Sequence, residues 1–207
     1  MQRLFFVRHG KTEYNLANRV QGGAIDSPLL EQSKKDAVKT GAVLNSYGIK
    51  QIIASPQKRV VDTTKLITSQ FHHPYAIHYA EEYKEFGYGK WEGAYIPDFE
   101  KEEPELFFNL LHRPDLYDPE AFSGETYQQL IRRGTKTVTE TIKQFPDQDL
   151  LFVGHSITTT ATLSSLLGKE LKAIRSHTPL ENTSISVLHY QNKSFSLDTW
   201  NQTGHLH

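Results

Sequence analysis

The sequence LFFVRHGKTEYN, residues 4–15, places four apolar residues directly before an arginine, a histidine and a glycine. A short, continuous apolar run of this kind is typical of a strand that is buried on both faces of a sheet. The sequence LLFVGHS, residues 150–156, has the same form, with Gly154, His155 and Ser156 directly after four apolar residues. Because ligands of open α/β sheets bind beyond the carboxyl ends of strands, both histidines are expected in one crevice.

The rest of the chain alternates short apolar runs with longer amphipathic segments, a pattern typical of a layered α/β fold. Strands are predicted over residues 4–7, 51–54, 75–79, 150–153, 184–189 and 194–200. The last two runs alternate apolar and polar residues, which indicates a hairpin or edge pair across Gln191-Asn192. We therefore expect a three-layer α/β/α sandwich whose central sheet is mostly parallel, with one antiparallel edge strand.

Four long helices are expected to connect these strands, over residues 30–47, 55–70, 125–145 and 156–167. The start of the second helix is indicated by Ser55, a residue type that is favourable at the N-cap, and by Pro56 at the first helical position. Gly168 is expected to adopt a left-handed conformation and to end the last helix.

Residues 94–124 differ from the rest of the chain. They contain Pro97, Pro104, Pro114 and Pro119 among acidic and aromatic residues. Proline at this density is incompatible with long regular elements, so only one short helix is predicted, around residues 105–111. The segment is expected to form a lid or substrate wall over the active site. Because about thirty residues are too few for a separate domain, residues 1–207 are expected to form one domain that carries this insertion.

The composition excludes several classes of protein. Lys and Arg total 23 against 24 Asp and Glu, and a net charge of −1 leaves no electrostatic footprint for nucleic acid or an anionic membrane. No apolar run approaches the roughly 18 residues of a membrane span, and the N-terminus lacks a secretory signal. The absence of cysteine excludes disulfides and thiolate metal sites. We expect a cytoplasmic protein without a nucleic-acid or membrane partner.

Cationic and imidazole side chains are expected together at the ends of the predicted strands. Arg8 and His9 follow the first strand, and His155 follows the fourth. Arg59 lies in the first turn of the helix that begins after the second strand. Guanidinium groups bind phosphate oxygens through paired hydrogen bonds, and the free N–H groups of a helix N-terminus add partial positive charge. This set of residues predicts a phosphate-binding pocket.

The sequence resembles the histidine phosphatase superfamily, and the resemblance covers nearly the whole chain. The matching segments are Arg8 to Asn15 (RHGKTEYN), Gln21-Gly22, Ser27-Pro28-Leu29, Ser55 to Arg59 (SPQKR), Glu85 with Gly89 and Trp91-Glu92-Gly93, Gly154-His155-Ser156 and Asn182-Thr183-Ser184. The family usually has a threonine where Leu30 stands here, and this difference is expected to remove a helix cap rather than a catalytic group.

The resemblance implies a role for each matched residue. His9 is the expected nucleophile, whose imidazole nitrogen attacks phosphorus and carries the phosphoryl group covalently. Arg8 and Arg59 disfavour protonation of His9 and hold the transferring oxygens, and His155 is a further donor. Glu85 is expected to protonate the leaving alkoxide and then to deprotonate water. The residues expected to contact phosphate or the near end of the substrate are Arg8, Asn15, Gln21, Gly22, Arg59, His155 and Ser156, and neither a metal nor a cofactor is implied.

The segment around Glu85 lacks the tyrosine–glycine–glycine sequence associated with the mutases, which favours hydrolysis. We therefore expect a metal-independent phosphomonoesterase that hydrolyses small phosphorylated metabolites through phosphohistidine, as a monomer or homodimer. The first alternative is a cofactor-dependent phosphoglycerate mutase with the same nucleophile. The others are a metallohydrolase built on His9, His155 and an acid such as Asp62 or Glu85, and a non-catalytic phospholigand-binding module.

Some of these residues also have simpler explanations. Glu85 taken alone could be a solvated surface charge, and Arg59 could be an exposed residue of its helix. The pair His72-His73 is expected in an exposed loop rather than at a metal, and residues 204–207 are expected to fray. His177 could line the pocket or cap a helix, and it receives no assigned role.

Overall fold

A six-stranded sheet runs through the centre of the computed structural model, which describes all 207 residues. Its strands are β1 (Gln2–Arg8), β2 (Gln51–Ala54), β3 (Ala76–Tyr79), β4 (Leu150–Gly154), β5 (Ile185–Gln191) and β6 (Ser194–Gln202). They lie in the order β3-β2-β4-β1-β5-β6. Strands β3, β2, β4 and β1 pair in parallel, whereas β5 pairs antiparallel with both β1 and β6. The antiparallel pairing is therefore confined to one edge of the sheet, as predicted.

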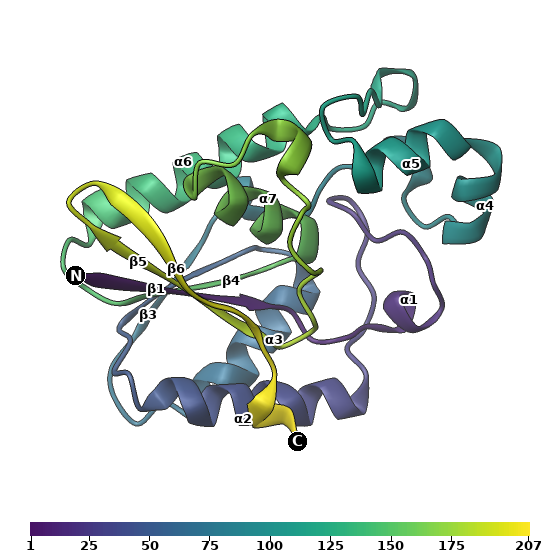
Figure 1. The fold of residues 1–207 in the computed structure, drawn as a ribbon. Coiled ribbons are helices and arrows are strands. Elements are labelled where there is room, and N and C mark those ends of the chain that lie inside the picture. The colour runs from purple at the N-terminus through teal and green to yellow at the C-terminus, as the bar shows by residue number, and fades with distance from the viewer.

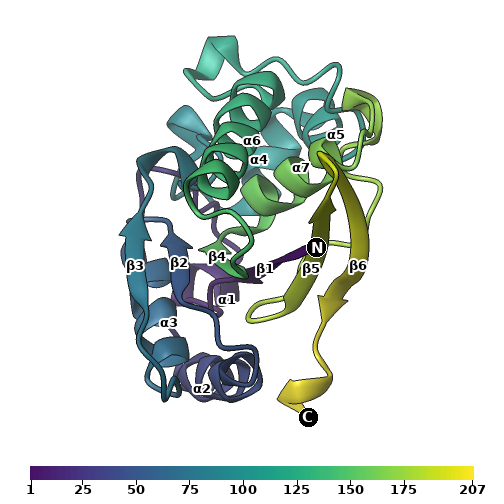
Figure 2. The same ribbon diagram turned by 90° about the vertical axis from the view of Figure 1, so that its left-hand side faces the viewer.

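Helices cover both faces of the sheet. The helices of the chain are α1 (Glu13–Leu16), α2 (Glu31–Asn45), α3 (Lys58–Thr68), α4 (Ile96–Glu102), α5 (Pro104–His112), α6 (Tyr127–Gln144) and α7 (Ser156–Leu166), of which α2, α3, α6 and α7 cover the sheet. Figure 1 shows α2 and α3 below the sheet and α6 and α7 above it, and Figure 2 shows the same layers from the side. The predicted three-layer α/β/α sandwich is thus confirmed. None of these helices is both long enough and apolar enough to cross a membrane.

The continuous apolar character of β1 follows from its position between two helical layers. Successive side chains of a strand point to opposite faces. Phe5 and Val7 accordingly join the core cluster shared with α2 and α3, whereas Leu4 and Phe6 join the cluster shared with α6 and α7. All four side chains are buried, so both faces of the strand need apolar residues.

Helix α3 begins later than predicted. Its N-cap is Gln57, whose own side chain makes no capping hydrogen bond. Ser55, the expected cap, instead continues the strand, since its N–H donates to the carbonyl of Val153 at 3.1 Å. Its hydroxyl lies 2.8 Å from Nε2 of His155. The prediction of Ser55 as the N-cap was wrong because this hydroxyl binds a histidine from a strand distant in sequence.

Two further predictions need correction near the C-terminus. The β5–β6 turn is centred on Asn192 and Lys193, one residue later than predicted, and both adopt the left-handed conformation that two-residue hairpins require. The chain end is not frayed, because Gly204–Leu206 form a 3₁₀ turn against α2. Nε2 of His205 lies 3.0 Å from the hydroxyl of Thr40 and 3.2 Å from the carbonyl oxygen of Thr183.

The insertion contains two helices, α4 and α5, instead of one. Pro97 and Pro104 lie in the first turns of these helices, where the missing N–H group of proline is no disadvantage. The indole of Trp91 stacks on Phe99 with ring centroids 4.3 Å apart. The prolines therefore start helices here, and aromatic packing anchors the insertion to the rest of the core.

Gly41 allows α2 to approach α3 closely, and this contact gives a test of the packing. A Cβ atom at Gly41 would lie 2.2 Å from the carbonyl oxygen of Ile67. In a helix interior, alanine is normally more stabilising than glycine by about 1 kcal/mol. We nevertheless expect Gly41→Ala to lower the free energy of unfolding, by about 1–3 kcal/mol, because overpacking forces the helices apart. Urea denaturation measures the change. Gly204→Ala, which meets no atom within 4 Å, is the control, and an unchanged or raised stability of the Gly41 variant would contradict this account.

Candidate active site

The pairing of β1 with β4 brings the two strand-end histidines together. Arg8 is opposite Gly154 in the register, and the N–H of His9 donates to the carbonyl of Gly154 at 2.9 Å. The imidazole rings of His9 and His155 are then 5.3 Å apart between centroids, at an angle of 65°. Both rings are buried, with 3% and 0% of the residue exposed.

The hydrogen bonding of His9 defines which ring nitrogen can react. Nδ1 lies 2.8 Å from the carbonyl oxygen of Gly10, which can only accept a hydrogen bond, so Nδ1 carries the proton. In the neutral ring, Nε2 then has a free lone pair. Burial, followed by the charges of Arg59 and Arg8, holds the pKa of His9 well below its ordinary value of 6.5. His9 is thus a neutral imidazole at neutral pH, as a nucleophile must be.

His155 is oriented by the hydroxyl of Ser55. Burial, followed by the charges of Arg59 and His9, also holds the pKa of His155 well below its ordinary value. In the tautomer in which Nε2 accepts from the Ser55 hydroxyl, 2.8 Å away, Nδ1 carries the proton. Nδ1 is buried and has no hydrogen-bond partner within the protein. A buried donor without a partner is costly, so this N–H is available for an anion.

The two arginines lie close to these rings, Arg59 buried and Arg8 half-buried. Arg8 donates from Nη1 to the carbonyl of Leu180 at 2.6 Å, and its Nε is buried without a partner. Arg59 is 1% exposed, so it is not the surface residue that the simpler explanation supposed. Its guanidinium donates to Asp26 Oδ1 and to the carbonyls of Ile25 and Gly22, at 2.8 to 3.1 Å. Its Nε likewise has no partner.

Helix α1 carries Asn15, and the loop after it carries Gln21 and Gly22, all three of which were expected near phosphate. Asn15 and Gln21 line the same cavity as His9, whereas Gly22 is not among its lining residues. The hydroxyl of Thr12 donates to Gln21 Oε1 at 2.8 Å and holds that amide in place. A Cβ atom at Gly22 would lie 2.6 Å from the carbonyl oxygen of Phe86. The role of Gly22 is therefore close packing and the acceptance of a hydrogen bond from Arg59.

Glu85 is a buried group of the site and not a solvated charge, because only 6% of the residue is exposed. Its Oε2 accepts from the backbone N–H groups of Ser156 and Ile157, at 3.1 and 3.3 Å. Its Oε1 accepts from both the N–H and the hydroxyl of Thr158, each at 2.9 Å, and from its neighbour Phe86. The carboxylate therefore occupies the N-terminus of α7, where free N–H groups and the helix dipole favour an anion.

Sequence reasoning missed two residues that organise this carboxylate. Thr158 binds it directly, as described above. Gln57 accepts from the backbone N–H of Glu85 at 2.9 Å and donates to the carbonyl of Gly22 at 2.9 Å, so it joins the two loops. Thr158 could have been found from a local signal, because it lies two residues after Ser156 in the first turn of a helix that follows a strand end. Nothing local connects Gln57 to Glu85, 28 residues away.

A cavity of about 280 Å³ is lined by some of these groups, but neither Arg59 nor His155 is among its lining residues. Its polar lining includes Arg8, His9, Glu85 and Ser156, and two more cations, Arg19 and Arg175. Glu85 is its only carboxylate. The remaining wall is mainly apolar and comes largely from the insertion, through Ile96, Phe99, Phe107, Leu110 and Leu111. His177 is not part of it, since that ring stacks on Trp200 with centroids 4.3 Å apart.

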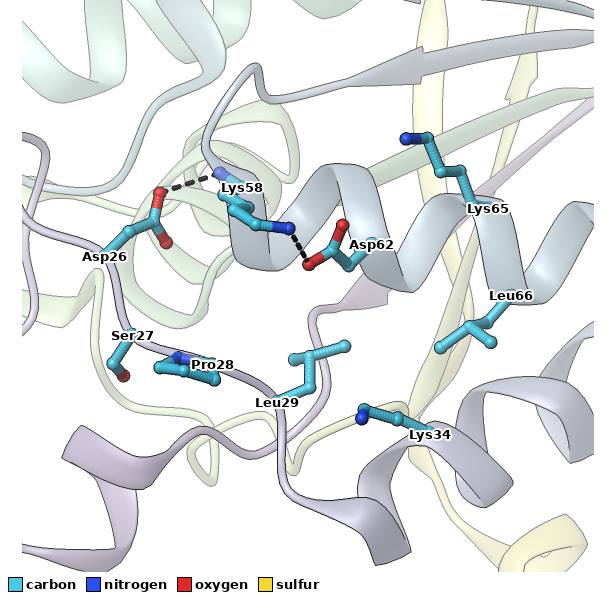
Figure 3. Close-up of a pocket in the computed structure, with 9 residues that line it drawn as sticks. All are labelled: Asp26, Ser27, Pro28, Leu29, Lys34, Lys58, Asp62, Lys65 and Leu66. Atoms are coloured by element: carbon cyan, nitrogen blue, oxygen red, sulfur yellow. Dashed lines mark hydrogen bonds and ion pairs between the residues drawn. The ribbon is translucent and has the colours of Figure 1, made fainter.

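A second cavity, of about 480 Å³, lies between α2, α3 and the loop before α2. Figure 3 shows Asp62 in this cavity, paired with Lys58 at 2.6 Å. Asp26 also borders it, and this carboxylate accepts from the N–H groups of Lys58 and Arg59 at the start of α3. Asp62 therefore belongs to a different cavity from His9, and the structure does not bring together the set of His9, His155 and Asp62.

Two histidines and two arginines gathered at the ends of strands suit a protein that acts on phosphate groups, and comparison with known families identifies the class. A family model described as the histidine phosphatase superfamily, branch 1, matches residues 4–203. The chain belongs to this superfamily, whose members are phosphatases or phosphoglycerate mutases.

Individual relatives carry both kinds of name. The chain is 26% identical to a Bacillus subtilis protein described as the uncharacterized phosphatase PhoE, over 100% of this chain and 97% of that protein. It is 28% identical to a Salmonella paratyphi A protein described as the probable phosphoglycerate mutase GpmB, over 97% and 90% of the two chains. The solved structure of Bacillus stearothermophilus YhfR has a TM-score of 0.92 at 24% identity and covers both chains fully, which shows a shared fold.

The lowered pKa values of His9 and His155 predict how stability depends on pH. Unfolding restores the ordinary pKa, so the unfolded chain takes up protons below about pH 6.5 that the folded chain does not. The free energy of unfolding should therefore fall with decreasing pH below 6.5, by up to about 1.4 kcal/mol per pH unit for each ring. Urea denaturation between about pH 7.5 and 5.5 measures this slope.

Two variants identify the source of that slope. His9→Asn should make it shallower, because one of the two buried rings is removed. His72→Asn, at an exposed position, controls for the loss of a histidine as such. The assignment fails if the His9 variant retains the full slope of the original protein.

Proposed function

We propose that this protein is a metal-independent phosphomonoesterase that hydrolyses small phosphorylated metabolites through a phosphohistidine intermediate on His9. One observation carries the proposal. The neutral ring of His9 has its Nδ1 proton bound to Gly10, which leaves the Nε2 lone pair free beside the guanidinium groups of Arg8, half-buried, and Arg59, buried. A nucleophile that is surrounded by cations suits attack on a phosphate dianion.

In the first half-reaction, Nε2 of His9 forms a bond to phosphorus while the bond from phosphorus to the ester oxygen breaks. Arg8 and Arg59 stabilise the charge on the transferring oxygens, and their unpartnered Nε–H groups are available for this purpose. The Nδ1–H of His155 supplies a further donor. Glu85, which lines the same cavity, gives a proton to the leaving alkoxide.

The second half-reaction uses water. Glu85 removes a proton from the water molecule, whose oxygen attacks phosphorus and releases His9 with inorganic phosphate.

The cavity supports a small, anionic substrate. Its volume of about 280 Å³ lies near the lower end of the range for ligand pockets, roughly 300–1,000 Å³. Arg19 and Arg175 extend the positive charge beyond the phosphate site. Relatives with phosphatase names, including a metal-independent phosphoserine phosphatase of Arabidopsis thaliana that is 28% identical, are consistent with this substrate class.

A phosphoglycerate mutase with the same nucleophile is the alternative that the relatives also support, because GpmB carries that name. The two activities differ in the fate of the phosphoryl group. A phosphatase admits water to phosphohistidine, whereas a mutase returns the group to a bound glycerate. Release of inorganic phosphate from several esters supports the phosphatase. Interconversion of 2- and 3-phosphoglycerate that depends on bisphosphoglycerate would instead establish the mutase.

The phosphoenzyme is the direct test of the proposal. Rapid quench with a phosphoester labelled in its phosphoryl group should place label on His9, and that label should be labile in acid and stable in alkali. It should be absent in His9→Ala. Chelators should not change the rate of turnover. Label that persists in the variant, or turnover that needs a divalent metal, overturns the proposal. Affinity for the ester without turnover would identify a binding module instead.

The proposed role of Glu85 predicts a dependence on the leaving group. Glu85→Gln should lower kcat/KM for alkyl phosphates by about 100-fold or more, since poor leaving groups need a proton. The loss for 4-nitrophenyl phosphate should be much smaller, because nitrophenolate leaves without help. The parameter kcat/KM is used because it reports transfer to His9 and not the later hydrolysis. Equal losses for the two substrates would argue against an acid role.

A further inference from the structure

Arg133 of α6 lies beside the segment that carries Glu85. Its Nε and Nη2 donate to the two carboxylate oxygens of Glu125, at 2.6 and 2.8 Å. This paired geometry is the strong form of an arginine–carboxylate interaction. Both side chains are largely buried, with exposed fractions of 20% and 17%. The pair therefore holds the guanidinium in a single orientation.

The same guanidinium also binds the main chain next to the proposed acid. Nη1 donates to the carbonyls of Glu82 and Lys84, at 2.7 and 2.6 Å. Nη2 donates to the carbonyl of Glu85 itself, at 3.1 Å. Three carbonyl groups within four residues thus converge on one side chain, which fixes the backbone that leads to Glu85.

Glu125 holds the other end of this segment. Its Oε2 accepts from the N–H of Gly87 at 3.2 Å, and its own N–H donates to the carbonyl of Gly87 at 2.7 Å. Arg133 and Glu125 together, which we name the 125–133 clamp, therefore bind the backbone at Glu85 and again two residues later. The Glu85 side chain is held separately, by the N-terminus of α7.

These contacts place Glu85 between two helices that pack closely. Gly134 of α6 lies so close to α7 that a Cβ atom there would be 2.0 Å from the hydroxyl of Thr162. Glu85 itself lies in neither helix and in no strand. Its position relative to His9, which follows β1, must therefore come from hydrogen bonds made outside the regular elements. Gln57 accepts from the N–H of Glu85 and the α7 donors bind its carboxylate, whereas its carbonyl is bound by the clamp, through Arg133.

We infer that Arg133 and Glu125 are positioning residues for the proton transfer at Glu85. The 125–133 clamp does not line the cavity of His9 and touches no reacting atom. It acts by holding the main chain of Glu85 where the carboxylate reaches both the α7 donors and the ester oxygen. The inference rests on the proposed acid role of Glu85. An error of about 1 Å in such a placement can cost a factor of about 100 in rate.

Arg133→Lys is the sharpest variant with which to test the clamp. Lysine retains the positive charge, but its ammonium cannot reproduce the planar fork that binds Glu125 and three carbonyls at once. We expect kcat/KM for alkyl phosphates to fall about 10-fold or more, because proton donation is impaired. For 4-nitrophenyl phosphate the fall should be less than about 3-fold. Glu125→Gln should show the same selective loss, which gives an independent variant should the lysine variant fold poorly.

Two controls separate positioning from a merely structural role. Arg132→Lys makes the same change at the neighbouring, exposed residue and should leave both substrates unaffected. In a double-mutant cycle, Arg133→Lys added to Glu85→Gln should cause little further loss with alkyl phosphates, since both act through one proton transfer. Equal losses for the two substrates, or fully additive effects, overturn the inference.

The outcome also distinguishes this inference from the proposed function. If Glu85→Gln is selective for poor leaving groups and the clamp variants are not, the acid role stands and the clamp inference is wrong. If Glu85→Gln itself causes equal losses, the proposed acid role fails first, and with it the basis for the clamp. Label on His9 tests the nucleophile independently of both results.

Discussion

The parallel pairing of β1 with β4 places Arg8 opposite Gly154, so that the two strands end together and are followed by His9 and His155. The position of His9, the proposed nucleophile, is thus set by a ladder of backbone hydrogen bonds between buried strands. β4 is buried along its whole length, and its neighbours are rigid strands. Such a scaffold keeps His9 in place far better than a mobile loop would.

The same burial defines the electrostatics of the site. His9 and His155 stay uncharged because desolvation and nearby arginines act in the same direction on their pKa values. Burial is also the main cause that lowers the pKa of Arg8. Of the two arginines beside these histidines, only Arg59 forms an ion pair, with Asp26. Positive charge with unpartnered donors in a dry site is costly, and a phosphate dianion relieves that cost by supplying the missing acceptors.

The sequence predicted what is local and missed what is not. The two histidines and the two arginines could be found because each lies at a strand end or in the first turn of a helix. Ser55 was misassigned because its hydroxyl binds His155, 100 residues away. The prolines of the insertion were taken for helix breakers, but Pro97 and Pro104 lie in the first turns of α4 and α5. Gln57 and Arg133 act on Glu85 only through the fold.

Glu85 shows the difference between residues that local sequence places and residues that tertiary contacts place. The proposed nucleophile and Arg8 lie at the end of β1 and Arg59 lies in the first turn of α3, whereas the proposed acid lies on an irregular segment and is held by side chains and helix N–H groups. The apolar wall of the cavity belongs to a third part, the insertion. In the proposed mechanism, phosphate binding, proton transfer and contact with the leaving group are therefore carried by separate parts of the chain. The apolar wall could consequently change in sequence without disturbing the groups proposed to hold the phosphate.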